Sequence, residues 1–359
     1  MRLGVLGDIH VNKRQDSLVF HDYDSKFYKD VFFPYLVANK IDTIIQTGDF
    51  FDRRKFTNHN GLYLFKKYFL DTMISHNIKM IMYLGNHDIV YKNTLEVNSP
   101  ELLLEDYITR GHITLIKKPV TMMFGDEDVK IDFVPWICED NQQEIKDFIT
   151  ATKSQICFGH FALTGFQESR DHVCENGMNR EDLDVYDIVI SGHFHHRSSD
   201  GHIFYVGSPG EMNWADYGDK RGFHIFDTVT RELEFIENPY HMFFKVIYDG
   251  KNETSETIES KNYEIYRSAY IKIIIDNKEN MILFDRFIEK LYEINPTELI
   301  IMENFSQNTE LSESDIIDQS DDTQTIISKY IDSTESNLDK NRLKGFVSDV
   351  YKEALGIEL

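Results

Sequence analysis

Short apolar runs recur along the first 240 or so residues, and a polar residue able to bind a metal follows several of them directly. Each run is continuous rather than alternating, which is typical of strands buried on both faces of a layered α/β protein. Helices are expected over 25–39 and 62–76, and Pro34 must start, end or kink the first. We therefore predict an α/β fold of packed layers. The runs are 3–6, 43–46, 80–84, 131–134, 156–158, 188–190 and 204–206.

The residues that follow these runs have the types that bind divalent metals. The carboxyl ends of strands meet at one edge of an open α/β sheet, where ligand sites form, so side chains from different runs are expected to meet there. Asp and Asn oxygens with His nitrogens, without thiolates, suit Mn, Fe or Zn better than Ca. The motifs are Asp8-x-His10, Gly48-Asp49-x-x-Asp52, Gly85-Asn86-His87-Asp88, Gly159-His160 and Gly192-His193-x-His195.

The spacing inside these motifs also favours a shared site. Glycine precedes four of the polar groups, and we expect it to let the chain turn sharply at the strand ends. In Asp8-x-His10 and His193-x-His195, an extended backbone would place both members on one side.

The composition excludes several classes of protein. The 38 Lys and Arg against 61 Asp and Glu leave a net charge of −23, which argues against a free-standing basic DNA-binding protein and is compatible with a cation site. No run of about 18 apolar residues is present to cross a bilayer, and residues 1–8 lack the features of a secretory signal, so we expect a cytoplasmic protein. The three cysteines fit neither a disulfide framework nor a thiolate zinc site.

The chain divides by composition after about residue 237. Residues 1–237 carry the α/β pattern, and residues 238–303 read as a small β-β-α-β domain that would cap it. Residues 304–325 are acidic, contain neither Lys nor Arg, and are predicted to form a flexible linker. Residues 326–359 have the apolar spacing of two short amphipathic helices, which would either fold back on the chain or dock on another protein.

Taken together and in this order, the five motifs resemble the calcineurin-like binuclear metallophosphoesterase superfamily, over about residues 1–235. Within it, the turn Gly207-Ser208-Pro209, residues 219–223, the small second domain and the tail resemble SbcD/Mre-type DNA repair nuclease subunits. The resemblance is strongest to the recombination endonuclease subunits of T-even-like tailed phages. It implies a β-sandwich flanked by helices, with a small α+β capping domain and a C-terminal helical tail.

Carried over residue by residue, the resemblance implies two divalent metal ions, expected to be Mn²⁺ with Mg²⁺ as the alternative. His87 would contact the scissile phosphate and assist the leaving group as an imidazolium, and Asp88 would orient its ring. Asp52 is assigned no catalytic role and is expected to shape its loop. One metal would be held by Asp8, His10, Asp49 and His195, and the other by Asp49, Asn86, His160 and His193.

The implied reaction is hydrolysis of DNA phosphodiester bonds, at double-stranded ends and in single strands, by an exonuclease or endonuclease. Two cations about 3.5 to 4 Å apart lower the pKa of water and hold the phosphate for in-line attack. The implied partners are DNA, an SbcC/Rad-type coiled-coil ATPase bound through residues 326–359, and a second copy of the chain that meets helices near 25–39 and 62–76. Such a phage-encoded subunit would act in the host cytoplasm.

Two other functions stay open at this point. A phosphatase or phosphodiesterase acting on phosphoproteins or small molecules is suggested by residues 48–53, which are similar to a protein phosphatase motif. A non-catalytic scaffold that binds through residues 326–359 is the third, and the complete ligand set counts against it. Arg53-Arg54-Lys55 either reaches DNA phosphates or forms a solvated loop. Trp136 and Trp214 are expected to be core or turn residues rather than platforms for base stacking.

Overall fold

The computed structural model describes residues 1–169, 172–175, 177–303, 327, 330, 331, 340, 342–347 and 350. It falls into two compact units, the first formed by Met1–Gly210 with Asp219–Tyr240, and the second by Glu211–Gly218 with the described residues from His241 onward. The predicted linker 304–325 lies outside the described residues, and the predicted tail 326–359 lies largely outside them. Both therefore stay predictions.

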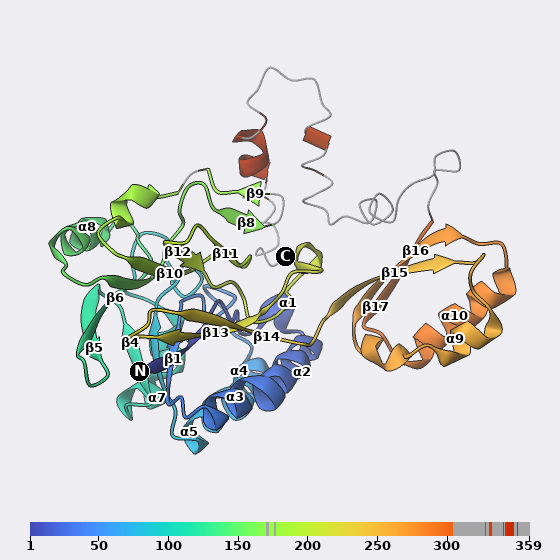
Figure 1. Cartoon of the computed structure of the whole chain (residues 1–359), viewed down its shortest axis with the longest axis horizontal. Helices are drawn as coiled ribbons and strands as arrows, with labels where there is room; N and C mark the ends of the chain where they lie inside the picture. Colours follow the sequence, from blue (N-terminus) through green and yellow to red (C-terminus); the bar gives the residue numbers. More distant parts are fainter. Residues whose placement is uncertain are drawn as a thin grey trace. The chain divides into compact units, whose positions relative to one another are not determined.

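The first unit is a sandwich of two six-stranded sheets, ordered β14-β13-β1-β2-β3-β4 and β11-β12-β10-β7-β6-β5 (Figure 1). This arrangement confirms the predicted layered fold. The first sheet contains β1 (Arg2–Leu6), β2 (Thr43–Gln46), β3 (Lys79–Tyr83), β4 (Ile113–Ile116), β13 (Gly222–Asp227) and β14 (Leu233–Glu237). The second contains β5 (Val120–Phe124), β6 (Val129–Val134), β7 (Ile156–His160), β10 (Ile188–Gly192), β11 (Ser198–Ser199) and β12 (Ile203–Tyr205).

The strands are continuous apolar runs because both of their faces are buried. Val5 and Ile45 pack against Phe158 between the two sheets. Alternate residues, such as Leu6 and Ile44, face a second core on the outer side of the first sheet. The seven predicted runs therefore correspond to β1, β2, β3, β6, β7, β10 and β12.

Helices cover the outer face of each sheet (Figure 1). On the first sheet lie two long helices, each interrupted by one π turn: α2 (Leu18–Phe27), η1 (Tyr28–Phe32) and α3 (Phe33–Ala38), then α4 (His59–Phe65), η2 (Lys66–Leu70) and α5 (Asp71–Ser75). Pro34 does not end the first helix. It lies in the first turn of α3, two residues after the π turn ends, and its missing N–H falls where that wider turn alters the hydrogen-bond ladder. Phe32 stacks on Phe69 and joins the two helices.

On the second sheet lies α8 (Gln142–Ala151), which buries Ile145 and Ile149 against Val189 of β10. Short elements complete the first unit: α1 (Lys13–Asp16), α6 (Ser99–Leu103), α7 (Glu105–Thr109), the hairpin β8 (Gln167–Ser169) and β9 (His172–Val173), and the 3₁₀ turn η3 (Arg180–Leu183).

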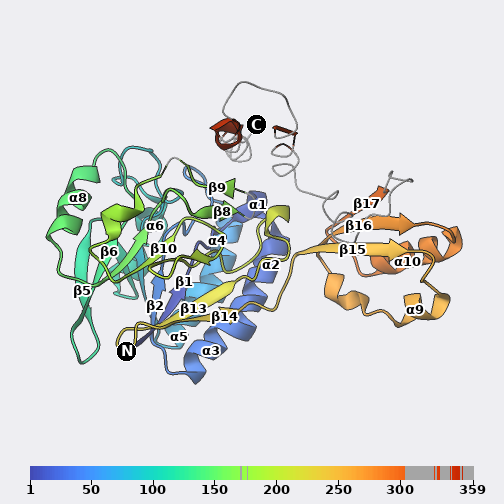
Figure 2. The same ribbon diagram turned by 45° about the horizontal axis from the view of Figure 1, so that its top comes forward.

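The second unit contains a parallel three-stranded sheet with helices on one face (Figure 2). Its elements are the 3₁₀ turn η4 (Trp214–Asp216), β15 (Phe243–Asp249), α9 (Ser255–Ser260), the 3₁₀ turn η5 (Tyr263–Tyr266), β16 (Tyr270–Asn277), α10 (Met281–Glu293) and β17 (Glu298–Glu303). The predicted β-β-α-β order was wrong, because α9 connects the first two strands. Parallel neighbours need such a crossover, but α9 buries only Ile258, which leaves a weak apolar signal in the sequence.

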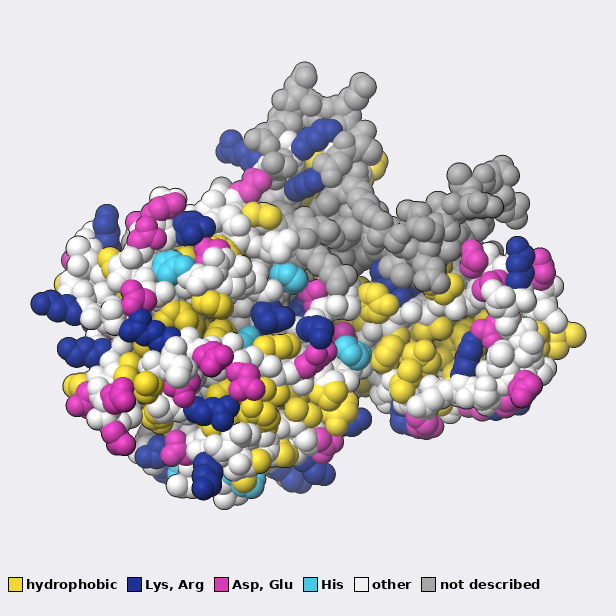
Figure 3. Space-filling model, in the orientation of Figure 1, with side chains coloured by type: hydrophobic (Ala, Val, Ile, Leu, Met, Phe, Trp, Pro, Cys, Tyr) yellow, Lys and Arg dark blue, Asp and Glu magenta, His cyan; other side chains and the backbone are white. Residues whose placement is uncertain are grey.

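Charged side chains of both signs are interspersed over the described residues of the face in Figure 3, without one continuous basic track. The three cysteines, Cys138, Cys157 and Cys174, are buried. Among the described residues, no helix combines the length and the apolar composition needed to cross a lipid bilayer.

Candidate metal centre

The five predicted motifs meet where β1, β2, β3, β7 and β10 end, at one edge of the sandwich. The first three strands belong to one sheet and the last two to the other. A hydrogen bond joins the two sheets here, because the main-chain N–H of His193 donates to Asp8 Oδ2 at 2.9 Å. The site is thus built from both layers.

The first group of ligand atoms comes from Asp8, His10 and His195. Their ligand atoms lie within 4.8 Å of one another. The Nε2 atoms of His10 and His195 face each other at 3.0 Å, and His195 Nε2 lies 3.8 Å from Asp8 Oδ2. Two imidazole nitrogens and a carboxylate that converge in this way are a candidate group for holding a divalent cation.

The second group comes from Asp49, His160 and His193, whose ligand atoms also lie within 4.8 Å of one another. Asn86 completes it, because its Oδ1 lies 3.1 Å from His160 Nε2 and 2.8 Å from His193 Nδ1. The amide oxygen and the two imidazoles therefore face one small volume.

Asp49 lies between the two groups. Its Oδ2 is 3.8 Å from His10 Nε2 in the first group and 3.4 Å from His160 Nε2 in the second. Its Oδ1 accepts a hydrogen bond from the main-chain N–H of His87 at 2.7 Å, which fixes the carboxylate. One carboxylate thus reaches both ligand groups.

The electrostatics of the site fit bound cations. Asp8 and Asp49 are 0% and 1% exposed, so two carboxylates share one buried volume. Burial, together with the charge of Asp49, raises the pKa of Asp8 to about 8. Burial also acts to raise the pKa of Asp49, but the charges of His160 and His87 outweigh it and hold that pKa well below its usual range. Divalent cations would neutralise this negative charge and let both carboxylates ionise.

The backbone around the ligands is not extended, contrary to the prediction for the two alternating pairs. His10 has φ 50° and His193 has φ 93°, both outside the strands and in a region that non-glycine residues rarely adopt. Asp49 is similar, with φ 49°. Strained conformations of this kind are typical of functional sites, where the surrounding structure maintains them.

The glycines have two different roles in the site. Gly48 has φ 89° and makes the predicted turn. Gly85 instead allows close approach, because a Cβ there would overlap the Asp49 carboxylate. A Cβ on Gly192 would lie 2.7 Å from Asp8 Oδ1. The sequence pattern therefore identified glycines that the site requires, but the sharp turn that it predicted explains Gly48 and not the close approach at Gly85 and Gly192.

Hydrogen bonds outside the ligand groups orient the imidazoles. His160 Nδ1 donates to the main-chain oxygen of Thr47 at 2.7 Å, which leaves Nε2 facing Asp49. His10 Nδ1 lies 3.2 Å from Asp52 Oδ1, which leaves its Nε2 for the first group. Such partners fix the tautomer of a ligating histidine. Burial acts to lower the pKa of His10, but the hydrogen bond with Asp52 and the charges of Asp49, Asp52 and Asp8 together outweigh burial and raise it.

Asp52 does more than shape its loop, which was the only role that the sequence analysis expected for it. Its carboxylate contacts His10, and its main-chain oxygen accepts a hydrogen bond from His87 Nδ1 at 2.7 Å. The sequence feature that could have indicated these contacts is the position of Asp52 in the motif, three residues after Asp49.

The expectation that Asp88 orients His87 was wrong. The Asp88 carboxylate accepts hydrogen bonds from the main-chain N–H groups of Phe50, Phe51 and Gly85 at 2.9 to 3.1 Å, which ties two ligand loops together. Burial, with the charge of Asp49, raises the pKa of Asp88 to about 7. The main-chain oxygen of Asp52 orients His87 instead.

Burial lowers the pKa of His87, although the charge of Asp49 acts against that shift. The imidazolium role of His87 in the reaction stays a prediction.

A buried network also holds the loop that carries His195. Arg221, which precedes β13, donates to the main-chain oxygen of His195 and, at 2.8 Å, to Ser208 Oγ. Its other terminal nitrogen donates to Asp219 Oδ2 at 3.2 Å, and the same oxygen lies 2.8 Å from His196 Nδ1. The segments 207–209 and 219–223, noted in the sequence for their resemblance, thus support a ligand loop.

Comparisons with known proteins agree with this geometry. The model of the family described as calcineurin-like phosphoesterase matches residues 1–197, more than half of the chain. The chain belongs to the calcineurin-like phosphoesterase family. This phosphoesterase is a hydrolase, and the resemblance read from its motifs is confirmed.

Individual proteins also resemble this phosphoesterase. It is 28% identical over 357 residues to Exonuclease subunit 1 of Enterobacteria phage T4, covering 99% of each chain. Two solved structures align with TM-scores below 0.5. A hypothetical protein from Thermus thermophilus has a TM-score of 0.34 at 13% identity, covering 67% of this chain and 100% of that one. GAP50, described as the anchor in the inner membrane complex of Plasmodium, has a TM-score of 0.37 at 12% identity, covering 88% and 98%.

Proposed function

We propose that this chain is the nuclease subunit of a DNA-processing enzyme that hydrolyses phosphodiester bonds at double-stranded ends and in single strands. The observation that carries the proposal is the similarity along 99% of the chain to a protein named as an exonuclease subunit. The convergence of seven ligand side chains in the same chain supports it.

The metal-binding roles follow from the two ligand groups. Each group would hold one divalent cation, expected to be Mn²⁺, with Asp49 shared between them. When bound, two such cations lower the pKa of water and clamp a phosphate for in-line attack. The first site would use Asp8, His10, His195 and Asp49, and the second Asp49, Asn86, His160 and His193.

His87 would act on the leaving group. Its Nδ1 donates to the main-chain oxygen of Asp52, so Nε2 is the nitrogen left to meet a substrate. An arriving phosphate raises the pKa of the ring through its negative charge. The ring can then take up a proton and donate it to the leaving oxygen.

Arg54 supports phosphate binding at the same place. Its Nη1 is buried without a hydrogen-bond partner among the described residues. Burial lowers the pKa of Arg54, and the charge of Asp49 acts against that shift, which puts the guanidinium within electrostatic reach of the centre. A guanidinium that is partly desolvated and lacks a partner suits the fork geometry of a phosphate. Arg53, in contrast, is paired with Asp16 at 3.3 Å.

The role of Arg54 can be tested with its exposed neighbour as the control. Hydrogen bonds to charged groups contribute about 1.5 to 3 kcal/mol, so Arg54→Gln is expected to lower kcat/KM on DNA by about 10- to 150-fold. Lys55→Gln should stay near the wild-type value in the same assay. Equal values for the two variants would exclude a specific phosphate contact by Arg54.

The proposal includes two protein partners. An SbcC/Rad-type ATPase would bind through residues 326–359, and a second copy of the chain would pack on the helices of α2–α3 and α4–α5. Deletion of residues 326–359 should abolish the complex with the ATPase on gel filtration while Mn²⁺ binding persists. A complex that survives the deletion would exclude this segment as the docking element.

Substrate comparison distinguishes the nuclease from a phosphatase. Purified protein is incubated in Mn²⁺ with linear double-stranded DNA, single-stranded DNA and p-nitrophenyl phosphate, with and without the ATPase. We expect nucleotide release from DNA that disappears in His87→Ser. Intact DNA under every condition, with hydrolysis of the phosphomonoester, would replace the nuclease by a phosphatase.

A further inference from the structure

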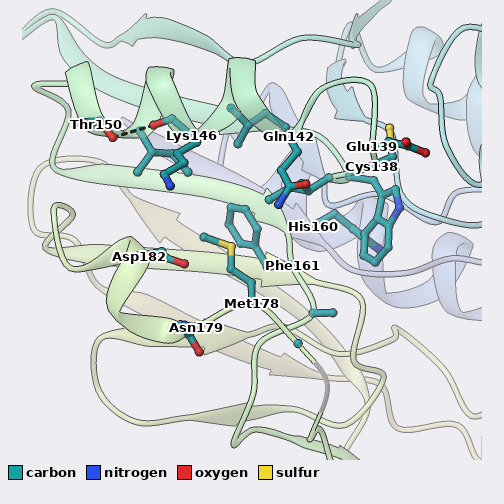
Figure 4. Close-up of a pocket in the computed structure, with 16 residues that line it drawn as sticks. Cys138, Glu139, Gln142, Lys146, Thr150, His160, Phe161, Met178, Asn179 and Asp182 are labelled. Atoms are coloured by element: carbon teal, nitrogen blue, oxygen red, sulfur yellow. Dashed lines mark hydrogen bonds between the residues drawn. The ribbon is translucent and has the colours of Figure 1, made fainter.

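A groove of about 710 Å³ lies beside the second ligand group, and His160 belongs to its wall. Figure 4 shows Lys146 and Thr150 of α8 along one side, Met178, Asn179 and Asp182 along the other, and Phe161 between them. Its described lining residues belong to the first unit. Its volume lies within the range of small-molecule sites.

Trp136 lies where the groove meets the metal centre. Its ring centroid is 5.1 Å from that of His193 and 5.8 Å from that of His160, and the side chain also lines the groove. The main chain of Trp136 is held on both sides, because its N–H donates to Leu84 O at 2.8 Å and its carbonyl accepts from Asn141 Nδ2 at 2.9 Å. The indole of Trp136 packs against the small core cluster that contains Leu84 and Cys138, which confirms the predicted core residue. It is only half-buried there, and it also lies next to the two histidines.

The groove has the chemistry of a nucleobase site. Phe161, Ile145 and Ile149 give it an apolar floor. Gln142 and Asn179 are exposed on its two sides, and their side-chain amides can both donate and accept hydrogen bonds. Amides of this kind can pair with the edges of any base.

The charges in the groove favour a base over a phosphate. Glu139 and Asp182 are acidic, and Lys146 is the only Lys or Arg among the described lining residues. Two acidic groups against one basic group would repel the sugar-phosphate backbone, whereas an uncharged base is not repelled. The phosphate would be attracted instead to divalent cations held by the adjacent ligand groups.

We infer that this groove holds an unpaired nucleobase of the strand whose phosphate lies at the metal centre, stacked on Trp136. The inference rests on the proposed nuclease function and adds a requirement to it. Because the groove takes one base out of the duplex, the substrate must present an unpaired or frayed nucleotide next to the bond that is cut.

The test uses the two tryptophans of the chain, Trp136 and Trp214, as separate reporters. Trp214→Phe leaves Trp136 as the only indole, and Trp136→Phe leaves Trp214 as the matched control. Each full-length variant is titrated with an oligothymidylate and with an abasic oligonucleotide of equal length, in Ca²⁺ and in EDTA. Fluorescence anisotropy of a label on the DNA measures binding in parallel.

We expect the oligothymidylate to quench the emission of Trp136, and the abasic strand to leave it unchanged. In a second measurement, Trp136→Ala is expected to weaken oligothymidylate binding by about 5- to 100-fold, with rescue by Trp136→Tyr. Its affinity for the abasic strand should change little. A variant that merely disturbs the metal centre would weaken binding of both strands equally, and that result would overturn the inference.

Unchanged emission of Trp136 at DNA concentrations that saturate the anisotropy would also overturn the inference, while the nuclease proposal survives. A different result separates the two proposals: no anisotropy change with any DNA, together with no cleavage in Mn²⁺, would overturn the nuclease function itself and the base site with it.

Discussion

Replacing Arg221 by methionine tests whether the buried network behind His195 supports the metal centre. The side chain of Arg221 is 4% exposed and that of Asp219 is 9% exposed. Methionine replaces the apolar stem of arginine but lacks the donors to His195, Ser208 and Asp219. Breaking a buried ion pair from one side costs about 3 to 5 kcal/mol, because it leaves the other charge unpaired. We expect a loss of that size in the free energy of unfolding.

The same change should weaken one metal site and spare the other. His195 belongs to the first ligand group, and loss of an outer-shell partner typically lowers metal affinity by about 10- to 100-fold. In the second group, His160 Nδ1 is held by the main-chain oxygen of Thr47 and His193 Nδ1 lies 2.8 Å from Asn86 Oδ1, whereas Arg221 donates to the main chain of His195. Calorimetric titration with Mn²⁺ should therefore show one weakened site and one unchanged site.

Urea unfolding in EDTA measures the loss of stability without metal. Lys220→Met is the matched control, since Lys220 is 65% exposed and its pair with Glu237 is of a kind that contributes about 1 kcal/mol or less. If Arg221→Met bound both metal ions as the wild type does and unfolded at the same urea concentration, the network would have neither role and the reasoning would be refuted.

Two further predictions concern His224 and Gly85. Burial and the charge of Arg197 lower the pKa of His224 from 6.5 to about 3. Below pH 6.5 the unfolded state therefore binds more protons than the folded state. The contribution of neutral His224 to the free energy of unfolding is present above that pH and is lost as the pH falls. From pH 7.5 to pH 5 the loss amounts to about 2 kcal/mol of the free energy of unfolding. His224→Leu should remove this part of the pH dependence, measured by urea unfolding in EDTA. Equal losses in the wild type and in His224→Leu would contradict the prediction. Gly85→Ala should weaken binding of both Mn²⁺ ions in calorimetry, because its Cβ overlaps the Asp49 carboxylate. Gly4→Ala is the control, because its Cβ comes close only to the flexible end of Leu36 and makes an ordinary van der Waals contact of 3.7 Å with the Thr43 main-chain oxygen. Wild-type Mn²⁺ affinity in Gly85→Ala would show that Asp49 is not shared.

The strands of the sandwich core and the ligand residues were predictable from the sequence for one physical reason. Strands buried on both faces must be continuously apolar, and polar residues at their ends then stand out. The same rule explains why β5 and β14 were missed, since they have exposed or half-exposed positions and lack a continuous run. The buried strand β13 was missed for another reason, because His224 interrupts its apolar residues. The helix α9 was missed because only Ile258 is buried in it.

The contacts around the ligands were not predictable in the same way. The sequence does not show that His10, Asp49 and His193 adopt positive φ, because that strain is imposed by the packing of the loops. Asp88 is adjacent to His87 along the chain, yet its carboxylate binds the main chain of the 48–52 loop. Arg221 is 26 residues from His195, so its role depends on a long-range contact.

Cleavage of end-labelled linear DNA in Mn²⁺ by the wild-type chain and by Asp49→Ala, with Mn²⁺ binding measured on the same samples, tests the central claim most directly. The carboxylate of Asp49 reaches both ligand groups. We predict two bound Mn²⁺ ions and DNA cleavage for the wild type, and loss of cleavage together with weakened binding at both sites for Asp49→Ala. Undiminished cleavage by Asp49→Ala, or two bound ions without any cleavage by the wild type with or without the proposed ATPase partner, would contradict a two-metal DNA nuclease.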